Sequence, residues 1–365
     1  MNEKTITQNQ LFFVIIQAQI GIGFLSLPYN AHHYAKSDSW ISVIMAGVCI
    51  QIFILLIWLL MREHKGKTIF EISKTVLGKY VGSIINTAYI LYGVMVMSLV
   101  LVLFGDLIER WILETTPKAV TLLLILTAGI YLGKQNLRVI ARFFTIVNVI
   151  LIVLFVVSLF TFSQNLSFTN LLPIGHTGFK PIVLGAHEVI VSLLGFEIIL
   201  IILPLTQGIE FRSYKRVAWA NVAVILFYLY FSILSLVIFS PKEIAIIPEP
   251  VLYMLKGLSF RLIERVDMIV LSYWIFPMMT SCVVYLYIAS MGAAKLFHKG
   301  KRKYPVWYLS ILVYGIALIP SSEKEIQAFG KYVSLASYIF IAVIPLILLA
   351  LSLILKKFKT RSFSS

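Results

Sequence analysis

The first hydrophobic stretch of the chain is interrupted in its middle. Residues 5–35 contain no Asp, Glu, Lys or Arg, and this uncharged run is long enough to cross a bilayer. At its centre stands IGIGFLSLP, residues 20–28, whose glycines and proline disfavour a helix interior. In hydrocarbon, unwound backbone is tolerated only where it is buried in protein or lines a cavity. The sequence therefore predicts a broken membrane helix with a small-molecule site beside the break.

The composition is typical of a helical protein that crosses the membrane several times. Hydrophobic residues make up 60% of the chain and charged residues only 13%. The mean hydropathy is +0.94, which is more than a soluble core requires. No basic segment precedes a short apolar run with a cleavage site, so we expect no cleavable signal peptide. Cys49 and Cys282 lie in apolar runs, which favours buried thiols over a disulfide framework.

Hydrophobic segments of about 20 residues predict ten membrane spans in one all-α transmembrane domain, residues 1–365. Between spans two and three, residues 68–77 have the pattern of a short interfacial helix. Residues 248–265 carry leucines near helical spacing and form either a cap over the outer vestibule or a plain surface loop. The predicted spans are 9–34 (broken), 40–61, 81–108, 118–133, 140–162, 182–207 (broken), 217–240, 267–294, 305–320 and 332–355.

The basic residues are distributed unevenly between the two sides that ten spans define. Of the 31 Lys and Arg residues, 21 fall on the side of the termini and 10 on the other. Because basic residues concentrate in cytoplasmic loops, this bias predicts that both termini are cytoplasmic. The net charge of +15 is therefore interpreted as a topology signal and not as affinity for nucleic acid. The 21 residues are Lys4, Arg62, Lys65, Lys67, Lys74, Lys79, Lys134, Arg138, Arg142, Arg212, Lys215, Arg216, Lys295, Lys299, Lys301, Arg302, Lys303, Lys356, Lys357, Lys359 and Arg361.

The sixth span is also broken, at LGFE, residues 194–197, with Pro204 further on. Each break lies about 20 residues before the following span, and the remaining spans match in order. The pattern predicts five-plus-five inverted repeats, about 9–162 and about 182–355. Two broken helices at matching positions of inverted halves point to a binding site at the membrane midplane.

The two breaks also carry a resemblance to a known family. The Gly-x-Gly-Phe…Pro motif of residues 21–28 resembles the first-helix motif of the amino acid–polyamine–organocation superfamily, which has the LeuT-type fold. More narrowly, this motif, the Thr-x-x-Gln lead-in at residues 7–10 and the GFEI motif at 195–198 resemble the B subunits of spore germinant receptors. The resemblance implies a subunit in the inner membrane of a bacterial spore that works with a larger membrane A subunit and a lipoprotein C subunit.

The ends of the broken helices are the first candidates for contacts with a ligand. Free N–H groups at residues 22–25 suit a carboxylate, and free carbonyls near Gly21 and Gly195 suit an ammonium, so an α-amino acid fits. Close helix packing through small residues is the alternative reading of the glycines. The candidate ligand-binding residues are Gly21, Ile22, Gly23, Phe24, Leu25, Tyr92, Val96, Gly195, Phe196, Glu197, Thr280, Ser281 and Tyr285.

Polar side chains within the spans have competing interpretations. Glu197 is the only acid deep in a span, and it either braces the break, accepts an amine or carries a proton; bracing ranks first. Tyr92 shares a face with Val96 in span three, which walls the site in the family fold. Tyr92 is therefore a lid or a hydrogen-bond donor, and ordinary aromatic packing is the alternative. Thr280 and Ser281 resemble a sodium-coordinating pair of sodium-coupled relatives, and they also suit interhelical hydrogen bonds.

Enzyme readings find no support in the sequence. There is no GxSxG, no P-loop, no HExxH and no Cys/His cluster, so we expect no catalytic site, no cofactor and no metal. The leading hypothesis is a nutrient-sensing receptor subunit that binds a small germinant and triggers germination through partner subunits. The alternative is a proton- or sodium-coupled amino acid transporter. An amino acid is the first candidate ligand, and nucleosides and sugars remain open.

Overall fold

The computed structural model describes residues 5–21, 23–208, 210–258, 265–297 and 300–362. These residues are mostly helical, and no strand occurs among them. The α-helices are α1 (Gln8–Gln19), α2 (Gly23–Ala35), α3 (Ser39–Glu63), α4 (Ile69–Trp111), α5 (Lys118–Gly133), α6 (Leu137–Leu159), α7 (Phe179–Ser192), α8 (Ile199–Ile202), α9 (Glu210–Ile238), α10 (Pro241–Ile244), α11 (Pro250–Lys256), α12 (Val266–Phe297), α13 (Lys303–Ala317), α14 (Glu323–Tyr338) and α15 (Ile344–Ser362).

Each predicted span falls on a helix or a pair of helices. Spans one, six and ten are the pairs α1–α2, α7–α8 and α14–α15, and the others are α3, α4, α5, α6, α9, α12 and α13. Six of the described helical segments, or seven if the bent pair of span six counts as one, are long and apolar enough to cross a membrane. Helices α5 and α13 are shorter, with 16 and 15 residues. Neither thiol forms a disulfide, as predicted. Cys282 is buried, but Cys49 is only partly buried, so the prediction of a buried thiol is confirmed for Cys282 alone.

Both predicted breaks are present. Helix α1 begins with a capping box, in which Thr7 and Gln10 each bond the other's backbone N–H, and it ends at Gln19. The second helix of span one begins at Gly23. In span six, α7 stops at Ser192, and the segment that starts at Phe196 is bent from it by 53°.

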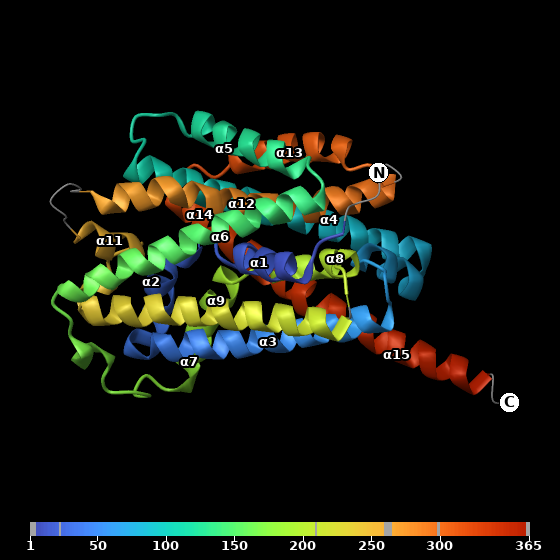
Figure 1. The fold of residues 1–365 in the computed structure, drawn as a ribbon, viewed down its shortest axis with the longest axis horizontal. Helices are drawn as coiled ribbons and strands as arrows, with labels where there is room; N and C mark the ends of the chain where they lie inside the picture. Colours follow the sequence, from blue (N-terminus) through green and yellow to red (C-terminus); the bar gives the residue numbers. More distant parts are fainter. Residues whose placement is uncertain (1–4, 22, 209, 259–264, 298–299, 363–365) are drawn as a thin grey trace.

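The helices form two groups on either side of the break region. One group, here called the bundle, contains α1, α2, α3, α7, α8 and α9, which pack on one another. The other, here called the scaffold, contains α4, α5, α12 and α13. Figure 1 shows α3, α7 and α9 in its lower half and α5, α12 and α13 in its upper half, with α6 crossing obliquely. Helix α14 packs on the scaffold helix α4, and α15 packs on α3.

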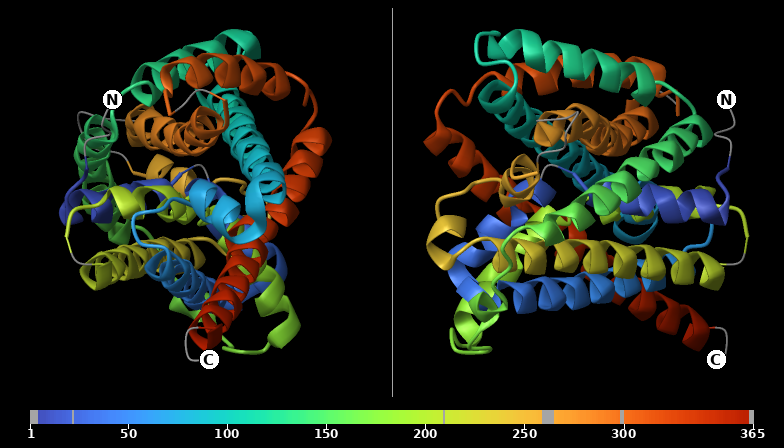
Figure 2. Two further views of the ribbon diagram at one scale, coloured as in Figure 1. Left: turned by 90° about the vertical axis from the view of Figure 1, so that its right-hand side faces the viewer. Right: turned by 60° about the vertical axis from the view of Figure 1, so that its left-hand side comes forward.

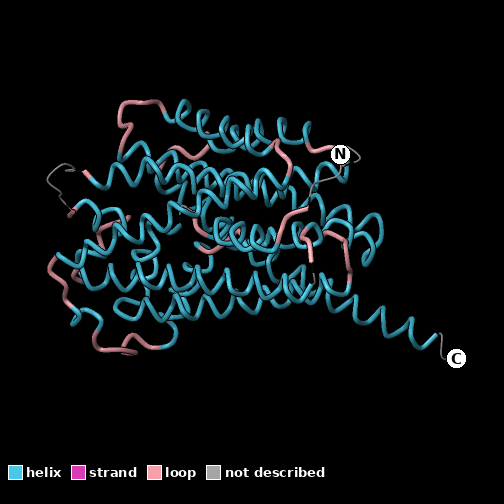
Figure 3. Tube along the Cα trace, viewed as in Figure 1, coloured by secondary structure: helices cyan, strands magenta, loops and turns pink. Residues whose placement is uncertain are grey.

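The long helices run between two opposite ends of the molecule. Helix α15 finishes at the end that carries both chain-terminus marks (Figures 1 and 2), and we call it the terminal end. The opposite end carries α11 and is called the α11 end. Loops gather at these two ends (Figure 3). Helix α11 packs against α2, α9 and α12 with Leu252 and Leu255 fully buried, so residues 248–258 form a packed cap rather than a plain loop. Residues 259–264 of the predicted segment lie outside the described residues.

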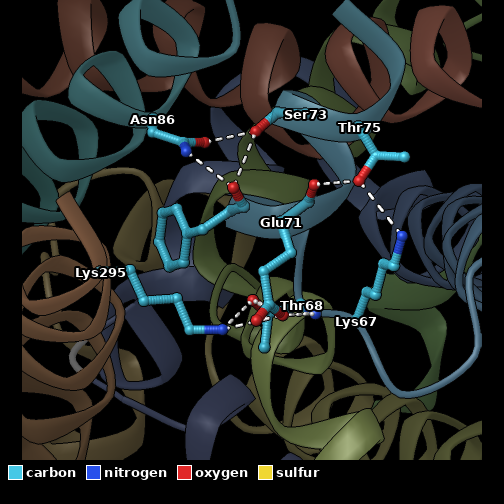
Figure 4. Close-up of polar contacts among 8 residues, drawn as sticks. Lys67, Thr68, Glu71, Ser73, Thr75, Asn86 and Lys295 are labelled. Atoms are coloured by element: carbon cyan, nitrogen blue, oxygen red, sulfur yellow. Dashed lines mark hydrogen bonds and ion pairs between the residues drawn. The ribbon is translucent and has the colours of Figure 1, made fainter. Parts of the chain in front are cut away.

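The predicted interfacial helix of residues 68–77 is helical and is docked onto the protein. It forms the first part of α4 and is separated from the rest of that element by a kink at Gly78, whose φ of +81° is a conformation that glycine adopts without strain. Figure 4 shows Lys295 of α12 reaching the cap of this helix, where its Nζ lies 2.9 Å from Glu71 Oε2 and 2.7 Å from Thr68 Oγ1. Burial opposes the ionised form of Glu71, but the Lys295 and Thr68 bonds prevail and hold its pKa below the usual value. This helix therefore ties α12 to the terminal end.

Candidate functional site

A cavity of about 370 Å³ lies between the bundle and the scaffold. Its deepest wall is formed at the break in span one, by residues such as Gln19, Gly21 and Gly23, with Ser281 and Tyr285 of α12. Helices α4 and α7 supply the side walls. Pockets of this size typically hold small molecules.

The cavity reaches the surface at the α11 end. Asp106, Arg110, Glu249 and Glu323 line its mouth. Arg110 Nη2 lies 2.7 Å from Glu249 Oε1 and 3.0 Å from Asp106 Oδ2, so the guanidinium links α4 to the start of α11. Burial raises the pKa of Glu249 above its usual value, although the nearby Arg110 charge opposes this. The predicted vestibule cap therefore forms part of the mouth.

The terminal end is closed by the two broken spans themselves. Ile6 N–H donates to Leu205 O at 3.0 Å, and Gln207 N–H donates to Ile6 O at 2.9 Å. Gln8 Nε2 adds a bond to Gln207 O at 2.6 Å. Ile6 is fully buried, and no described residue between 5 and 17 or between 195 and 247 lines the cavity. The cavity is therefore accessible from the α11 end and sealed at the terminal end.

Six of the predicted site residues line the cavity, and their glycines also pack closely. A Cβ added at Gly21 would lie 2.5 Å from Ser281 Oγ, and one at Gly23 would lie 2.8 Å from Ser192 Cα. The two glycines therefore pack closely and also line the cavity, and their contact with a ligand stays a prediction. The six residues are Gly21, Gly23, Leu25, Val96, Ser281 and Tyr285.

The other predicted site residues that the structure describes do not line the cavity. Phe24 is buried in an aromatic cluster, with ring centroids 5.0 Å from Phe231 and 5.1 Å from Trp274. Thr280 Oγ1 donates to Pro277 O at 2.7 Å, a bond within α12. Ile22 lies outside the described residues. Gly195, Phe196 and Glu197 form the break in span six, and Tyr92 of α4 donates a hydrogen bond to Glu197.

Glu197 has the geometry of a brace. Its Oε1 accepts hydrogen bonds from Tyr92 OH at 2.8 Å and Tyr285 OH at 2.9 Å. Its Oε2 accepts from Gly195 N–H at 2.7 Å. The ring of Tyr92 stacks on Phe340 with centroids 4.5 Å apart. Because a buried carboxylate is stable only when its oxygens are paired, this arrangement fixes the break against the scaffold.

Gly195 is required at the break in span six by its backbone and by its neighbour. Its φ is +121°, and a Cβ there would lie 1.9 Å from Ala18 O. Only glycine satisfies both conditions. The carbonyl that Gly195 approaches belongs to α1, so the two breaks are in direct contact.

The cavity-lining residues that the sequence prediction omits include Gln19 and Glu188. Gln19 is fully buried, and its Oε1 has no hydrogen-bond partner among the described residues. The carboxylate of Glu188 makes no hydrogen bond or ion pair with a described residue, and it lies one turn before Ser192, where α7 ends. The available signal was that Gln19 and Glu188 lie close in sequence to the two breaks. A polar side chain beside unwound backbone is close to any binding site that the break forms.

Comparisons with known proteins place the chain among germination proteins. A family model described as "Spore germination protein" matches residues 5–326. Spore germination protein GerQB of Bacillus cereus is 26% identical over 344 residues, covering 93% of this chain and 94% of that protein. Spore germination protein A2 of Bacillus subtilis strain 168 is 27% identical over 357 residues, covering 95% of each. Both are named for germination and neither for an enzymatic reaction.

A solved structure has the same fold as this chain. The crystal structure of MhsT in complex with L-phenylalanine matches with a TM-score of 0.69 at 12% identity, covering 97% of this chain and 99% of that chain. The match confirms the polytopic all-α, LeuT-type fold that the two breaks predict.

Proposed function

Because the chain belongs to the spore germination protein family, we propose that it is the nutrient-sensing subunit of a spore germination receptor. It is a multi-pass membrane protein, and the proposal places its ligand in the cavity between bundle and scaffold. The single observation that carries this is the shape of that cavity: it runs from the break in span one to the α11 end, while backbone bonds seal the terminal end.

The proposal places the terminal end in the cytoplasm and the protein in the inner membrane of the spore. The excess of Lys and Arg on the side of the termini, 21 against 10, supports this orientation. The cavity then opens away from the cytoplasm, on the side from which a nutrient arrives.

In this proposal, signalling requires only that the ligand binds two conformations of the protein with different affinities. It does not require a transport cycle. A ligand in this cavity touches both bundle and scaffold, so it stabilises the arrangement of the two groups that fits it best. A tenfold difference in affinity between two arrangements shifts their equilibrium by about 1.4 kcal/mol. We propose that larger membrane A and lipoprotein C subunits receive this shift. The coupled-transporter alternative instead requires the terminal end to open and release the ligand.

A pair of matched variants tests the cavity in spores. Val100 lines the cavity and is 9% exposed, whereas Ile146 of α6 is 69% exposed on the surface. We expect Val100→Phe to reduce the germination rate in response to amino acid mixtures by more than tenfold, because the ring fills the cavity. Ile146→Phe should germinate like the wild type. Equal germination of both variants, at equal protein levels, contradicts the proposal.

Reconstitution separates the receptor from the transporter. We expect liposomes containing this chain alone to accumulate no labelled amino acid when a proton or sodium gradient is imposed. We also expect germination to require the A and C subunits in the same spores. Gradient-driven uptake by the isolated chain would overturn the receptor proposal in favour of the transporter.

A further inference from the structure

We propose that the loop between α6 and α7, residues 160–178, lies in the headgroup region of the bilayer at the α11 end and anchors the protein there. This inference goes beyond the proposed function and holds whether the chain is a receptor or a transporter. Three features of the α6–α7 loop support it: its uncharged sequence, its exposed apolar side chains, and hydrogen bonds that fix its depth.

The sequence of the loop lacks charged residues. Residues 143–179 contain no Asp, Glu, Lys or Arg, and His176 is the only titratable side chain in the loop. Three other connections at the α11 end carry charges: Lys36 between α2 and α3, Glu114 between α4 and α5, and Lys242 after α9. Because charged side chains strongly favour water, those three connections suit an aqueous environment, and the α6–α7 loop differs from them.

The large apolar side chains of the loop are exposed. Phe168, Leu172 and Ile174 are 62%, 60% and 60% exposed, and Phe179, which begins α7, is 76% exposed. Four such side chains within residues 168–179 exceed the scattered apolar residues of an ordinary surface loop. Exposed apolar groups that gather in this way mark a surface that binds a protein or a membrane.

Hydrogen bonds place the loop at the depth where two spans end. Ser167 N–H donates to Val237 O at 2.8 Å, in the last turn of α9, and Asn170 Nδ2 donates to Phe239 O at 3.2 Å. Asp38, directly before α3, accepts from two backbone N–H groups of the loop. The loop is therefore level with the ends of spans two and seven, which is the boundary between hydrocarbon and water.

Lipid is the occupant that fits this surface, because the loop continues the lipid-facing side of α6. The apolar segment Leu137–Ser163 is long enough to cross a membrane, and only 33% of its most apolar part is buried. Ile152 and Leu159 are exposed along α6, and Phe160 and Phe162 extend this exposed surface into the loop. Figure 1 shows the loop, in green, at the lower left edge of the molecule, and none of its residues lines the cavity.

The loop enters only the interface and not the hydrocarbon core. Irregular backbone in contact with lipid is not tolerated in hydrocarbon, whereas the headgroup region offers water and polar groups to its N–H and C=O groups. Phe and Leu side chains can reach the acyl boundary from that depth. Since the loop leads into α7 and is bonded to Asp38, the anchor holds the α11 ends of both broken spans at a fixed depth.

A fluorescent reporter tests the proposal on the chain alone. The full chain carries Cys49→Ser and Cys282→Ala, which remove its two cysteines, and Ile174→Cys labelled with the fluorophore NBD. It is reconstituted in phosphatidylcholine nanodiscs. Ile152→Cys on α6 gives the lipid-facing reference, and Lys242→Cys gives the exposed reference in a charged connection. Quenching is measured with phosphatidylcholine that bears a nitroxide near the headgroup end of its acyl chain, and separately with aqueous iodide.

We expect the nitroxide lipid to quench the Ile174 label about threefold more than the Lys242 label, and iodide to quench it less. Phe168→Asp should lower the lipid quenching to the level of the Lys242 label, because a carboxylate does not remain at the acyl boundary. Asn165→Asp is the matched control: it adds the same charge at an exposed polar position of the loop and should change nothing. Addition of phosphatidylglycerol should also change nothing, since the loop has no Lys or Arg to attract an anionic lipid.

An Ile174 label that iodide quenches as strongly as the Lys242 label would overturn the proposal and leave the surface to a protein partner. Lipid quenching that survives Phe168→Asp, or that requires phosphatidylglycerol, would overturn it as well. The Ile152 label, placed in the same variants, should be quenched by the nitroxide lipid throughout, which shows that each protein is inserted in the bilayer.

Discussion

The two breaks occupy matching positions in sequence, yet the structure uses them differently. The break in span six is closed: Gly195 lies against Ala18 O, and Glu197 is fully hydrogen-bonded to the scaffold. The break in span one faces the cavity through Gly21 and Gly23. Repeat symmetry therefore places two weak points in the helices, and local packing decides that one is braced and the other forms a wall of the cavity.

The two broken spans are also fastened to each other along their length. At the terminal end, Ile6 pairs with the backbone of Leu205 and Gln207. Near the breaks, Tyr228 OH bridges Gln19 O at 3.0 Å and Ser192 O at 3.3 Å. These bonds hold spans one and six as one body, so a rearrangement that opens the terminal end has to break the Ile6 pairing or move the whole bundle against the scaffold.

The largest effect is expected from a methyl group at the closed break. Gly195→Ala places a Cβ 1.9 Å from a backbone carbonyl at a φ of +121°, so we expect destabilisation of about 4 kcal/mol or more, or no folded protein. Thermal unfolding in detergent measures this. Gly129→Ala is the control, because nothing lies within 4 Å of a Cβ there. Equal melting temperatures for both variants would show that the span-six break is not tightly packed.

The brace is tested by removing its carboxylate. Glu197→Ala leaves the hydroxyls of Tyr92 and Tyr285 and the N–H of Gly195 without acceptors, so we expect a loss of about 3 kcal/mol in the free energy of unfolding. Tyr92→Phe removes a single bond and should cost about 1 kcal/mol. Chemical denaturation of the detergent-solubilised protein gives both values. An alanine variant as stable as the wild type would remove Glu197 from the account of the break.

A methyl group at the open break should be tolerated far better. The Cβ of Gly21→Ala would lie 2.5 Å from Ser281 Oγ, the movable end of a side chain. We therefore expect a loss of about 1 kcal/mol. Adding Ser281→Ala should recover most of it, since the remaining Cβ lies 3.4 Å away, an ordinary contact. If Gly21→Ala is as damaging as Gly195→Ala, the contrast between the two breaks is wrong.

The fold was predictable because it depends on local signals. Runs of hydrophobic residues placed the spans, and glycine and proline placed both breaks, while the position of Glu197 directly after the break indicated a brace. The cavity wall was only partly predictable, because it is built from residues far apart in the chain. Gln19 is oriented by Asn221, 202 residues away, and neither hydropathy nor spacing shows which face of α7 turns Glu188 toward α4.

The smallest effect is expected from a substitution of Asp38, which follows span one. At the α11 end, this residue holds the loop that precedes span six. Its carboxylate accepts from Thr177 Oγ1 at 2.6 Å, Gly175 N–H at 2.7 Å and Thr177 N–H at 3.1 Å. Burial opposes its ionisation, but these bonds prevail and hold the pKa of Asp38 below its ordinary 3.8.

A group with a lowered folded-state pKa contributes stability above its unfolded pKa and loses it as the pH falls through the folded pKa. We therefore expect wild type to be more stable than Asp38→Asn at pH 7, by up to about 1 kcal/mol, and the difference to shrink below about pH 4. Melting curves in a His176→Gln background keep the nearby imidazole from titrating as well. A difference that does not change with pH would mean that the Asp38 charge does not help to join the two broken spans.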